Sequence, residues 1–226
     1  MFSVFALATR LFASKSDKDR ESFQQKQQML LQQLKQAGDL RTRQAILDTM
    51  MSENLLGAID LSNMVLHDIH LESANLEDAH LCHTSLPEAD LESADLQHAL
   101  LSEADLNRAD LSNANMGQAT LDHTHLDGAL LANANLNGAN LRYASLRNAS
   151  LYGAEMHGTC LDHTDLRGCC LMDATLARAS LQEALFDETT VLPDGEQWKP
   201  GLDLSRFTDP MHRDFAIRES AVSVIE

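Results

Sequence analysis

Large apolar residues recur at every fifth position from Leu61 to Phe186, without a change of phase over 26 positions. Leucine occupies 23 of these positions, and the exceptions are Met116, Met156 and Phe186. Two residues before each lies a second column of small or apolar residues, of which 18 are alanine and four are threonine. A period of five fits neither an α-helix nor a strand. A fixed repeat sustained over this length predicts a solenoid.

Each unit reads small–polar–Leu–polar–polar, so it offers two inward side chains in five. Both can be buried if the chain turns a corner after every unit and closes a square coil after four. The 26 units then make about six and a half coils, a rod of ~30 Å at the β spacing of ~4.8 Å. Each buried leucine contributes about 1.5–3 kcal/mol. Aspartate at Leu111 or Leu136 is predicted to collapse the stack, because its charge would be unpaired in an apolar interior.

Units such as Ala74-Asn75-Leu76-Glu77-Asp78 strongly resemble those of the pentapeptide-repeat family, over residues 59–186. The resemblance implies an all-β solenoid, a right-handed quadrilateral β-helix. The segment from Thr189 to Trp198, followed by Asp203-Leu204-Ser205-Arg206-Phe207-Thr208-Asp209-Pro210, is similar to a tail found in bacterial members, notably cyanobacterial ones. This chain departs from that tail by inserting Val191 and by having Arg213 in place of proline.

Both flanks of the repeats are predicted to be caps, because a solenoid otherwise exposes its interior and its strand edges at each end. We expect a flexible segment 1–20, an α-helical cap 21–55, the β-helix 56–186, an irregular C-terminal cap 187–215 and a tail 216–226. Helical spacing of apolar residues predicts helices over 22–37 and 40–52, separated by Gly38-Asp39. This hairpin either seals the first coil or forms a homodimer. Trp198 and Phe207 are predicted to cover the last coil.

The net charge of −17 is unevenly distributed. Residues 61–186 contain 18 acidic and five basic side chains, and residues 61–110 contain 11 acids with Arg108 alone. All 18 acids lie on outward positions, so all are expected to face solvent. Counting in twenties places seven of them on two adjacent walls. This acidic corner comprises Glu72, Glu77, Asp78, Asp90, Glu92, Asp95 and Asp110. It is interpreted either as a solvated surface that favours solubility or as a docking site for a basic protein.

No residue pattern indicates catalysis, a cofactor or a metal, since phosphate loops, nucleophile elbows and zinc-binding His motifs are absent from the sequence. His83, His123 and His163 share one outward column, but a spacing of about 9.6 Å is too large for one shared metal. Of the four cysteines, Cys169 is expected inward and the others outward, all as free thiols in a reducing cytoplasm. Residues 1–13 are apolar but short and interrupted by Arg10, so no signal peptide is predicted.

The sequence therefore favours a non-enzymatic, cytoplasmic scaffold whose outer walls bind a protein partner, without direct binding of nucleic acid. Two alternatives stay open. The family resemblance implies an acidic mimic of DNA that modulates a topoisomerase such as gyrase. The apolar stretch 1–13 would instead suit a regulator that contacts a membrane surface.

Overall fold

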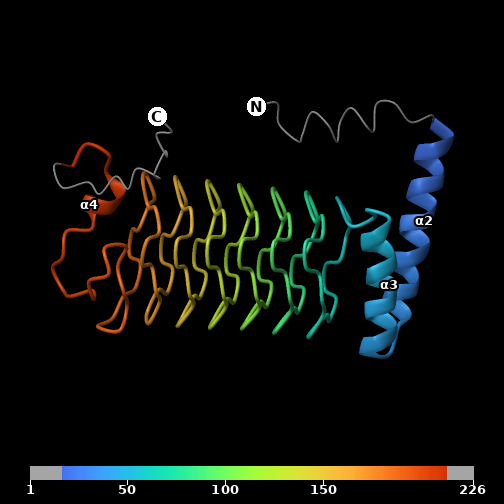
Figure 1. Cartoon of the computed structure of the whole chain (residues 1–226), viewed down its shortest axis with the longest axis horizontal. Helices are drawn as coiled ribbons and strands as arrows, with labels where there is room; N and C mark the ends of the chain where they lie inside the picture. The colour runs from blue at the N-terminus through green and yellow to red at the C-terminus, as the bar shows by residue number, and fades with distance from the viewer. Residues whose placement is uncertain (1–16, 213–226) are drawn as a thin grey trace, which may run out of the picture. The chain divides into compact units, whose positions relative to one another are not determined.

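The computed structural model describes residues 17–212 of the chain. The chain divides into two compact units, of which the first ends at Leu56 (Figure 1). The described part of the first contains two α-helices, and the second contains the repeats and the segment that follows them. The interpretations of residues 1–13 and 216–226 lie outside the described residues. Between residues 17 and 212, no helix combines the length and the apolar character needed to cross a membrane.

The two helices of the first unit are α2 (Asp17–Gln36) and α3 (Leu40–Ser52), and they contact each other. The bounds of α3 are those predicted. Helix α2 begins five residues earlier than predicted, so its first four residues lie within the segment 1–20 that was expected to be flexible. Residues 17–21 contain no apolar side chain, and hydrophobic periodicity therefore does not detect this first turn.

The turn between the helices is stabilised by Asp39, the N-cap of α3. Its carboxylate accepts hydrogen bonds from the backbone N–H of Thr42 at 2.9 Å and from the Thr42 hydroxyl at 2.8 Å. This is the cap predicted from the sequence. The Gln27 side chain donates to the Leu55 carbonyl at 2.9 Å, which ties α2 to the segment after α3. The role of this hairpin as a cap or a dimer contact stays a prediction.

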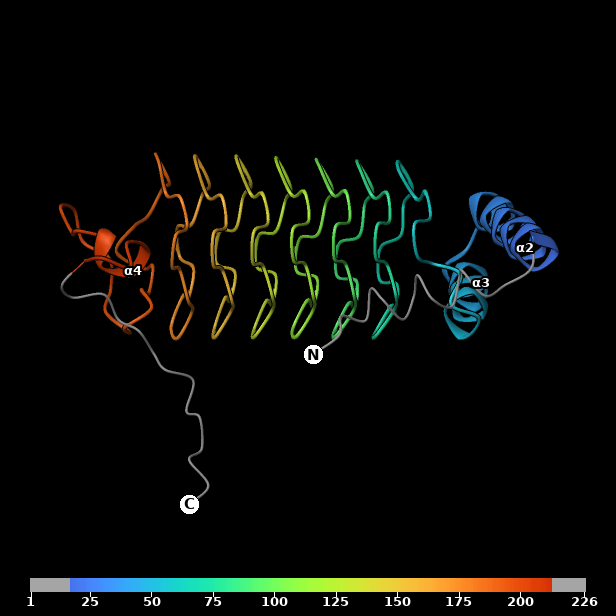
Figure 2. The same ribbon diagram turned by 90° about the horizontal axis from the view of Figure 1, so that it is seen from above.

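The second unit is a stack of square coils of twenty residues (Figure 2). The residue before each central leucine forms a parallel bridge with the residue twenty positions later, without interruption from Asp60 to Leu185. Leu91 illustrates the bonding, since its N–H donates to the Asp110 carbonyl at 2.7 Å and Asp110 donates back to Ala89 at 2.9 Å. Each wall has one bridged residue before the chain turns, so the ladders consist of single bridges rather than longer strands.

The interior is formed by the two predicted columns. Of their 52 positions, 48 are buried. Only Met64 near the first coil and Leu181, Ala184 and Phe186 in the last are half-buried, which corrects the expectation that all point into a closed core. The exceptions lie near the ends because a terminal coil has another coil on one side only.

The corners explain the period of five. At nearly every corner, the carbonyl of the residue in the leucine column accepts a hydrogen bond from the N–H three residues later, as in Ala94 to Leu91 at 3.1 Å. The residue two after each leucine has a positive φ, for example 58° at Ser93, as the third position of a type II turn requires. From Ala58 to Glu183 all 26 such positions share this conformation, and only five are glycine. The fold therefore accepts left-handed strain of about 1–2 kcal/mol at most corners.

In some coils, a corner side chain occupies the space where the corner glycine of the next coil would have its Cβ. A Cβ added to Gly153 would lie 2.6 Å from Asn133 Oδ1, whereas one added to Gly158 meets nothing within 4 Å. These two glycines have nearly equal φ values of 65° and 67° and lie in consecutive units. The backbone thus favours glycine at both positions, and a neighbouring side chain adds a steric reason for it at only one.

Polar residues in the small column are satisfied internally. The hydroxyls of Thr84, Thr124, Thr159 and Thr164 each donate to a leucine carbonyl 23 residues earlier, at 2.8–3.0 Å. Cys169 donates in the same way to Leu146 and is fully buried, as predicted. Burial raises the pKa of its thiol to about 12. The other three cysteines are half-buried, and all four are free thiols.

The period ends at the inserted Val191. Cys170 bridges to Val191, 21 residues later rather than twenty, and Val191 then pairs antiparallel with Gln197. The intervening turn has Gly195 at φ 83°, in the predicted Pro-Asp-Gly segment. The short helix α4 (Ser205–Thr208) follows, and the Arg178 N–H donates to the Thr208 carbonyl at 2.6 Å. This segment is therefore bonded to the last coil.

Candidate protein-binding surface

The acidic corner occupies two adjacent walls of the early coils. Bridges join His70 to Asp90 and Asp90 to Asp110 on one wall, and Asn75 to Asp95 on the next. The Ser73 N–H donates to the Glu92 carbonyl at 2.8 Å, which stacks the coil of Glu72 on that of Glu92. The stacking expected from counting in twenties is thus present. The role of these residues in binding stays a prediction.

The corner aspartates are held in place by the backbone. One oxygen each of Asp90, Asp95 and Asp110 accepts a hydrogen bond from the N–H two residues later, at 3.1, 3.2 and 2.9 Å. The pKa of a neighbouring carboxyl, that of Glu77, responds to the other acids of the corner. Partial burial, followed by the charges of Asp95 and Asp78, raises the pKa of Glu77. The carboxylates therefore lie close enough to repel one another.

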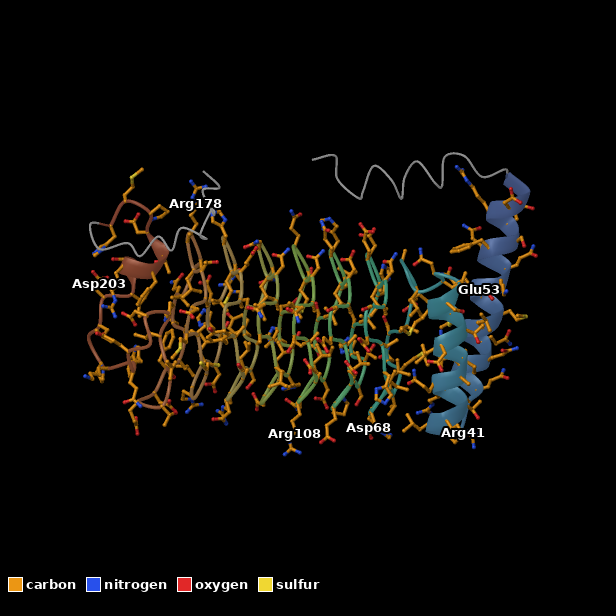
Figure 3. All side chains as sticks on the ribbon, viewed as in Figure 1. Arg41, Glu53, Asp68, Arg108, Arg178 and Asp203 are labelled. Atoms are coloured by element: carbon orange, nitrogen blue, oxygen red, sulfur yellow. The ribbon has the colours of Figure 1, made fainter. Side chains whose placement is uncertain are left out.

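No lysine or arginine between residues 17 and 212 forms an ion pair with a carboxylate of the acidic corner. The single arginine of the early coils, Arg108, pairs with Glu88 at 3.2 Å in a different column. Figure 3 shows Arg108 and Asp68 pointing outward along one edge of the solenoid and Arg178 along the opposite edge. Lysine and arginine side chains of the described residues thus leave the acidic corner unneutralised, and the basic group beside it is the imidazole of His70, 3.7 Å from Asp90.

Asp165, on a wall of the later coils, corrects the expectation that every acid faces solvent. Only 9% of Asp165 is exposed. Arg167 donates to it at 2.6 and 2.8 Å and Arg147 at 2.5 Å. These bonds, the Arg167 pair above all, hold the pKa of Asp165 well below its ordinary value. Counting in twenties places both arginines in one column beside Asp165. This proximity could have indicated the ion cluster, but classifying residues only as inward or outward does not reveal it.

The column that contains His83, His123 and His163 also contains Tyr143, whose ring stacks on two of the histidines. The ring of Tyr143 stacks between those of His123 and His163, with centroids 5.0 and 4.6 Å apart. His83 lies 3.3 Å from Glu103, and His163 lies 3.2 Å from Glu183. Within residues 17–212, no three His, Cys, Asp or Glu side chains are grouped to hold a metal. The column is a stacked ladder along one corner.

The two residues predicted as lids lie after the last repeat. The Trp198 ring stacks on Phe186, with centroids 5.9 Å apart and planes 14° from parallel. Phe207 is buried, and the Arg206 guanidinium lies 4.5 Å from its ring centroid. Their role in covering the last coil stays a prediction, although Trp198 contacts the final residue of the leucine column.

Four five-residue walls per coil, a left-handed residue at each corner and a Leu/Ala interior define a repeat protein of the β-helix class. The sequence model described as pentapeptide repeats matches residues 65–102, 89–128 and 129–168, with eight copies. Residues 65–168 of this chain therefore consist of pentapeptide repeats, and the fold is a right-handed quadrilateral β-helix.

Solved structures with similar coils include two from cyanobacteria. Rfr23 from Cyanothece 51142 is 24% identical, covers 65% of this chain and 96% of its own, and has a TM-score of 0.35. The alr5209 protein from Nostoc PCC 7120 is 29% identical over 46% of this chain and 82% of its own, with a TM-score of 0.34. Full-length QnrB1, a plasmid-mediated fluoroquinolone resistance protein, is 17% identical over 58% and 86%, with a TM-score of 0.33. No curated protein sequence matches this chain significantly.

Proposed function

We propose that this chain is a non-catalytic scaffold that binds a basic protein partner through the acidic corner. The observation that supports this proposal is the gathering of seven carboxylates on two adjacent walls, without a lysine or arginine paired to them in the described residues. A basic partner would relieve the repulsion from Asp95 and Asp78, which together with partial burial, the larger cause, raises the pKa of Glu77. Complementary charge of this kind favours fast and selective association.

The interior supports a role in binding rather than in catalysis. Its inward positions are filled by leucine and alanine, and the buried threonine hydroxyls already donate to carbonyls. Function is therefore assigned to the outer walls. The later coils contain Arg142, Arg147, Arg167 and Arg178, so the acidic surface does not continue along the solenoid as a mimic of duplex DNA would require.

The test compares two charge-reversal variants with the unmodified full chain. One changes Glu72, Asp78 and Glu92 to lysine, because no hydrogen bond depends on these side chains. The control changes Asp68 and Glu88, which share another corner column, and Glu188, which follows the last repeat, to lysine. Each protein is used to capture partners from a lysate of the source organism, and the retained proteins are quantified and then purified for titration.

The proposal predicts that at least one retained protein is basic, is lost with the corner variant and is kept with the control variant. Its affinity should also fall as salt is raised, because exposed charges are screened. An identical retained set for all three proteins would show that the acidic corner is not a binding surface. Inhibition of gyrase supercoiling by the purified chain would favour the DNA-mimic alternative instead.

A further inference from the structure

One wall of the solenoid changes character halfway along its length. Its middle column runs in steps of twenty from His70 to Cys170, and the adjacent column runs from Glu72 to Met172. We call these two columns the split wall. Its first three coils contain four carboxylates, and its next three contain no charged residue. The change falls between Asp110 and Leu130, which are bridged neighbours.

The second half of the split wall is an exposed apolar patch. Leu130 is 46% exposed, Tyr152 44% and Met172 38%, and they lie in three successive coils. The other exposed large apolar side chains of the repeats, Val65, Leu100, Tyr143 and Leu185, lie in other columns. The turn after the repeats borders the patch, since a Cβ on Gly195 would lie 3.7 Å from Met172 Cε. Three apolar side chains grouped in this way differ from the scattered ones that are normal on protein surfaces.

The carboxylates in the first half of the split wall restrict the kind of partner that can bind the apolar second half. Glu72, Asp90, Glu92 and Asp110 belong to the acidic corner, and Asp110 directly precedes Leu130 along the middle column. An occupant that covers the apolar half therefore also lies against carboxylates. This charge favours a protein segment with lysine or arginine over a membrane, because cytoplasmic lipid surfaces are themselves anionic.

The backbone of the wall restricts the occupant further. The N–H and C=O groups along the split wall already bond to neighbouring coils, as Leu91 does to Asp110 and Asp110 to Ala89. A wall of this kind offers no free edge to which a partner strand could be added. An α-helix satisfies its own backbone and presents a stripe of side chains, so it suits a wall that can offer only side-chain contacts.

We propose that the split wall binds one α-helix of a partner protein, basic in one half and apolar in the other, lying along the solenoid axis. This proposal rests on the proposed function and specifies the partner. The six coils from His70 to Cys170 span about 24 Å at the β spacing, which a helix of about 16 residues covers. The basic half would be the N-terminal one, because the positive end of the helix dipole then faces the acids.

The test uses two synthetic 18-residue peptides of equal composition. The block peptide has four lysines in its N-terminal half and four leucines in its C-terminal half, all on one helical face. In the alternated peptide, the same lysines and leucines are interleaved. Binding to the full chain is measured by fluorescence anisotropy, and induced helix by circular dichroism. The block peptide is expected to bind at least about tenfold more tightly and to gain helix on binding.

Three variants of the full chain locate the site. The apolar variant changes Leu130, Tyr152 and Met172 to serine, and its control changes Val65, Leu100 and Leu185 to serine on other walls. The acidic variant changes Glu72, Asp90, Glu92 and Asp110 to their amides, which keep the oxygens that accept backbone hydrogen bonds. All the changed side chains point outward, and thermal unfolding verifies that each variant is folded. The apolar and acidic variants should each lose the preference for the block peptide, and the control should keep it.

The outcomes separate this proposal from the proposed function. Loss of binding in the acidic variant, with none in the apolar variant, would overturn the split wall and leave the acidic corner as a binding surface. Unchanged binding in both would overturn both proposals. Equal affinity for the two peptides would also overturn the split wall. Binding of the chain to phosphatidylcholine vesicles that is lost in the apolar variant would assign the patch to lipid instead of protein.

Discussion

Replacing Gly158 and Gly153 by alanine should separate two reasons why glycine is favoured at these two corners. Both residues have positive φ values, of 67° and 65°, in consecutive units of the stack. A Cβ at Gly158 meets no atom within 4 Å, so Gly158→Ala reports the backbone alone. A Cβ at Gly153 meets Asn133 Oδ1 at 2.6 Å, so Gly153→Ala also displaces a side chain.

The expected magnitudes follow from this geometry. Left-handed backbone costs an L-residue about 1–2 kcal/mol, part of which is offset because alanine has fewer unfolded conformations than glycine. We therefore expect Gly158→Ala to lower the free energy of unfolding by about 1 kcal/mol. Moving the Asn133 side chain off its rotamer adds about 0.5–1.5 kcal/mol in Gly153→Ala. A loss of 1 kcal/mol corresponds to a fall of about 2–4 °C in the melting temperature for a chain of this size.

The assay is thermal and urea unfolding of the full chain, followed by circular dichroism. A third variant provides the control, since Asn133→Ala removes the side chain that Gly153→Ala would displace. The double variant Asn133→Ala/Gly153→Ala should show a coupling that recovers the added cost, relative to the two single variants. Equal destabilisation by Gly153→Ala and Gly158→Ala, or the absence of coupling with Asn133, would refute this explanation of the corners.

Three further predictions concern the core, an ion cluster and a thiol. Leu131→Ala should cost about 2–5 kcal/mol, against clearly less for Leu181→Ala, because Leu131 is fully buried and Leu181 half-buried; equal losses in urea unfolding would contradict this. The folded pKa of Asp165 is depressed, so its contribution to stability is present above its unfolded pKa of about 3.9 and is lost as the pH falls below it. The stability difference between the unmodified chain and Asp165→Asn should therefore be present at neutral pH and disappear in acid, and a constant difference would be inconsistent. At pH 8, a thiol reagent should label the three half-buried cysteines of the folded chain and reach Cys169 only after denaturation; rapid labelling of all four would contradict its burial.

Most of the solenoid could be predicted because its period is visible in single residues. Leucine and alanine at fixed spacing identify the inward columns, and Asp39 identifies the start of α3. The first turn of α2 could not be found in this way, because residues 17–21 are all polar and a helix there has no apolar periodicity to reveal it.

Only the acidic part of the candidate site was predicted from the sequence. Counting in twenties brings Glu72 and Glu92 together, but attention to charge alone leaves the apolar half of the same wall unnoticed. The same count places Leu130, Tyr152 and Met172 there, so the information was present in the sequence. The burial of Asp165 could not be counted, because it depends on how two long arginine side chains fold over a carboxylate.

Square coils of twenty residues give this architecture two distinct ways to change by insertion. Twenty extra residues between Asp110 and Leu130 would lengthen the gap between the acidic and apolar halves by one layer, about 4.8 Å, and leave both on their common wall. Five extra residues at the same point would instead turn every later side chain onto the neighbouring wall, a quarter turn away. Duplication of one five-residue unit thus rotates the side chains of all later coils by one wall, and duplication of four units moves them along the axis by one coil. Binding surfaces on such a chain can therefore be reoriented or separated in whole steps, without any change to the interior.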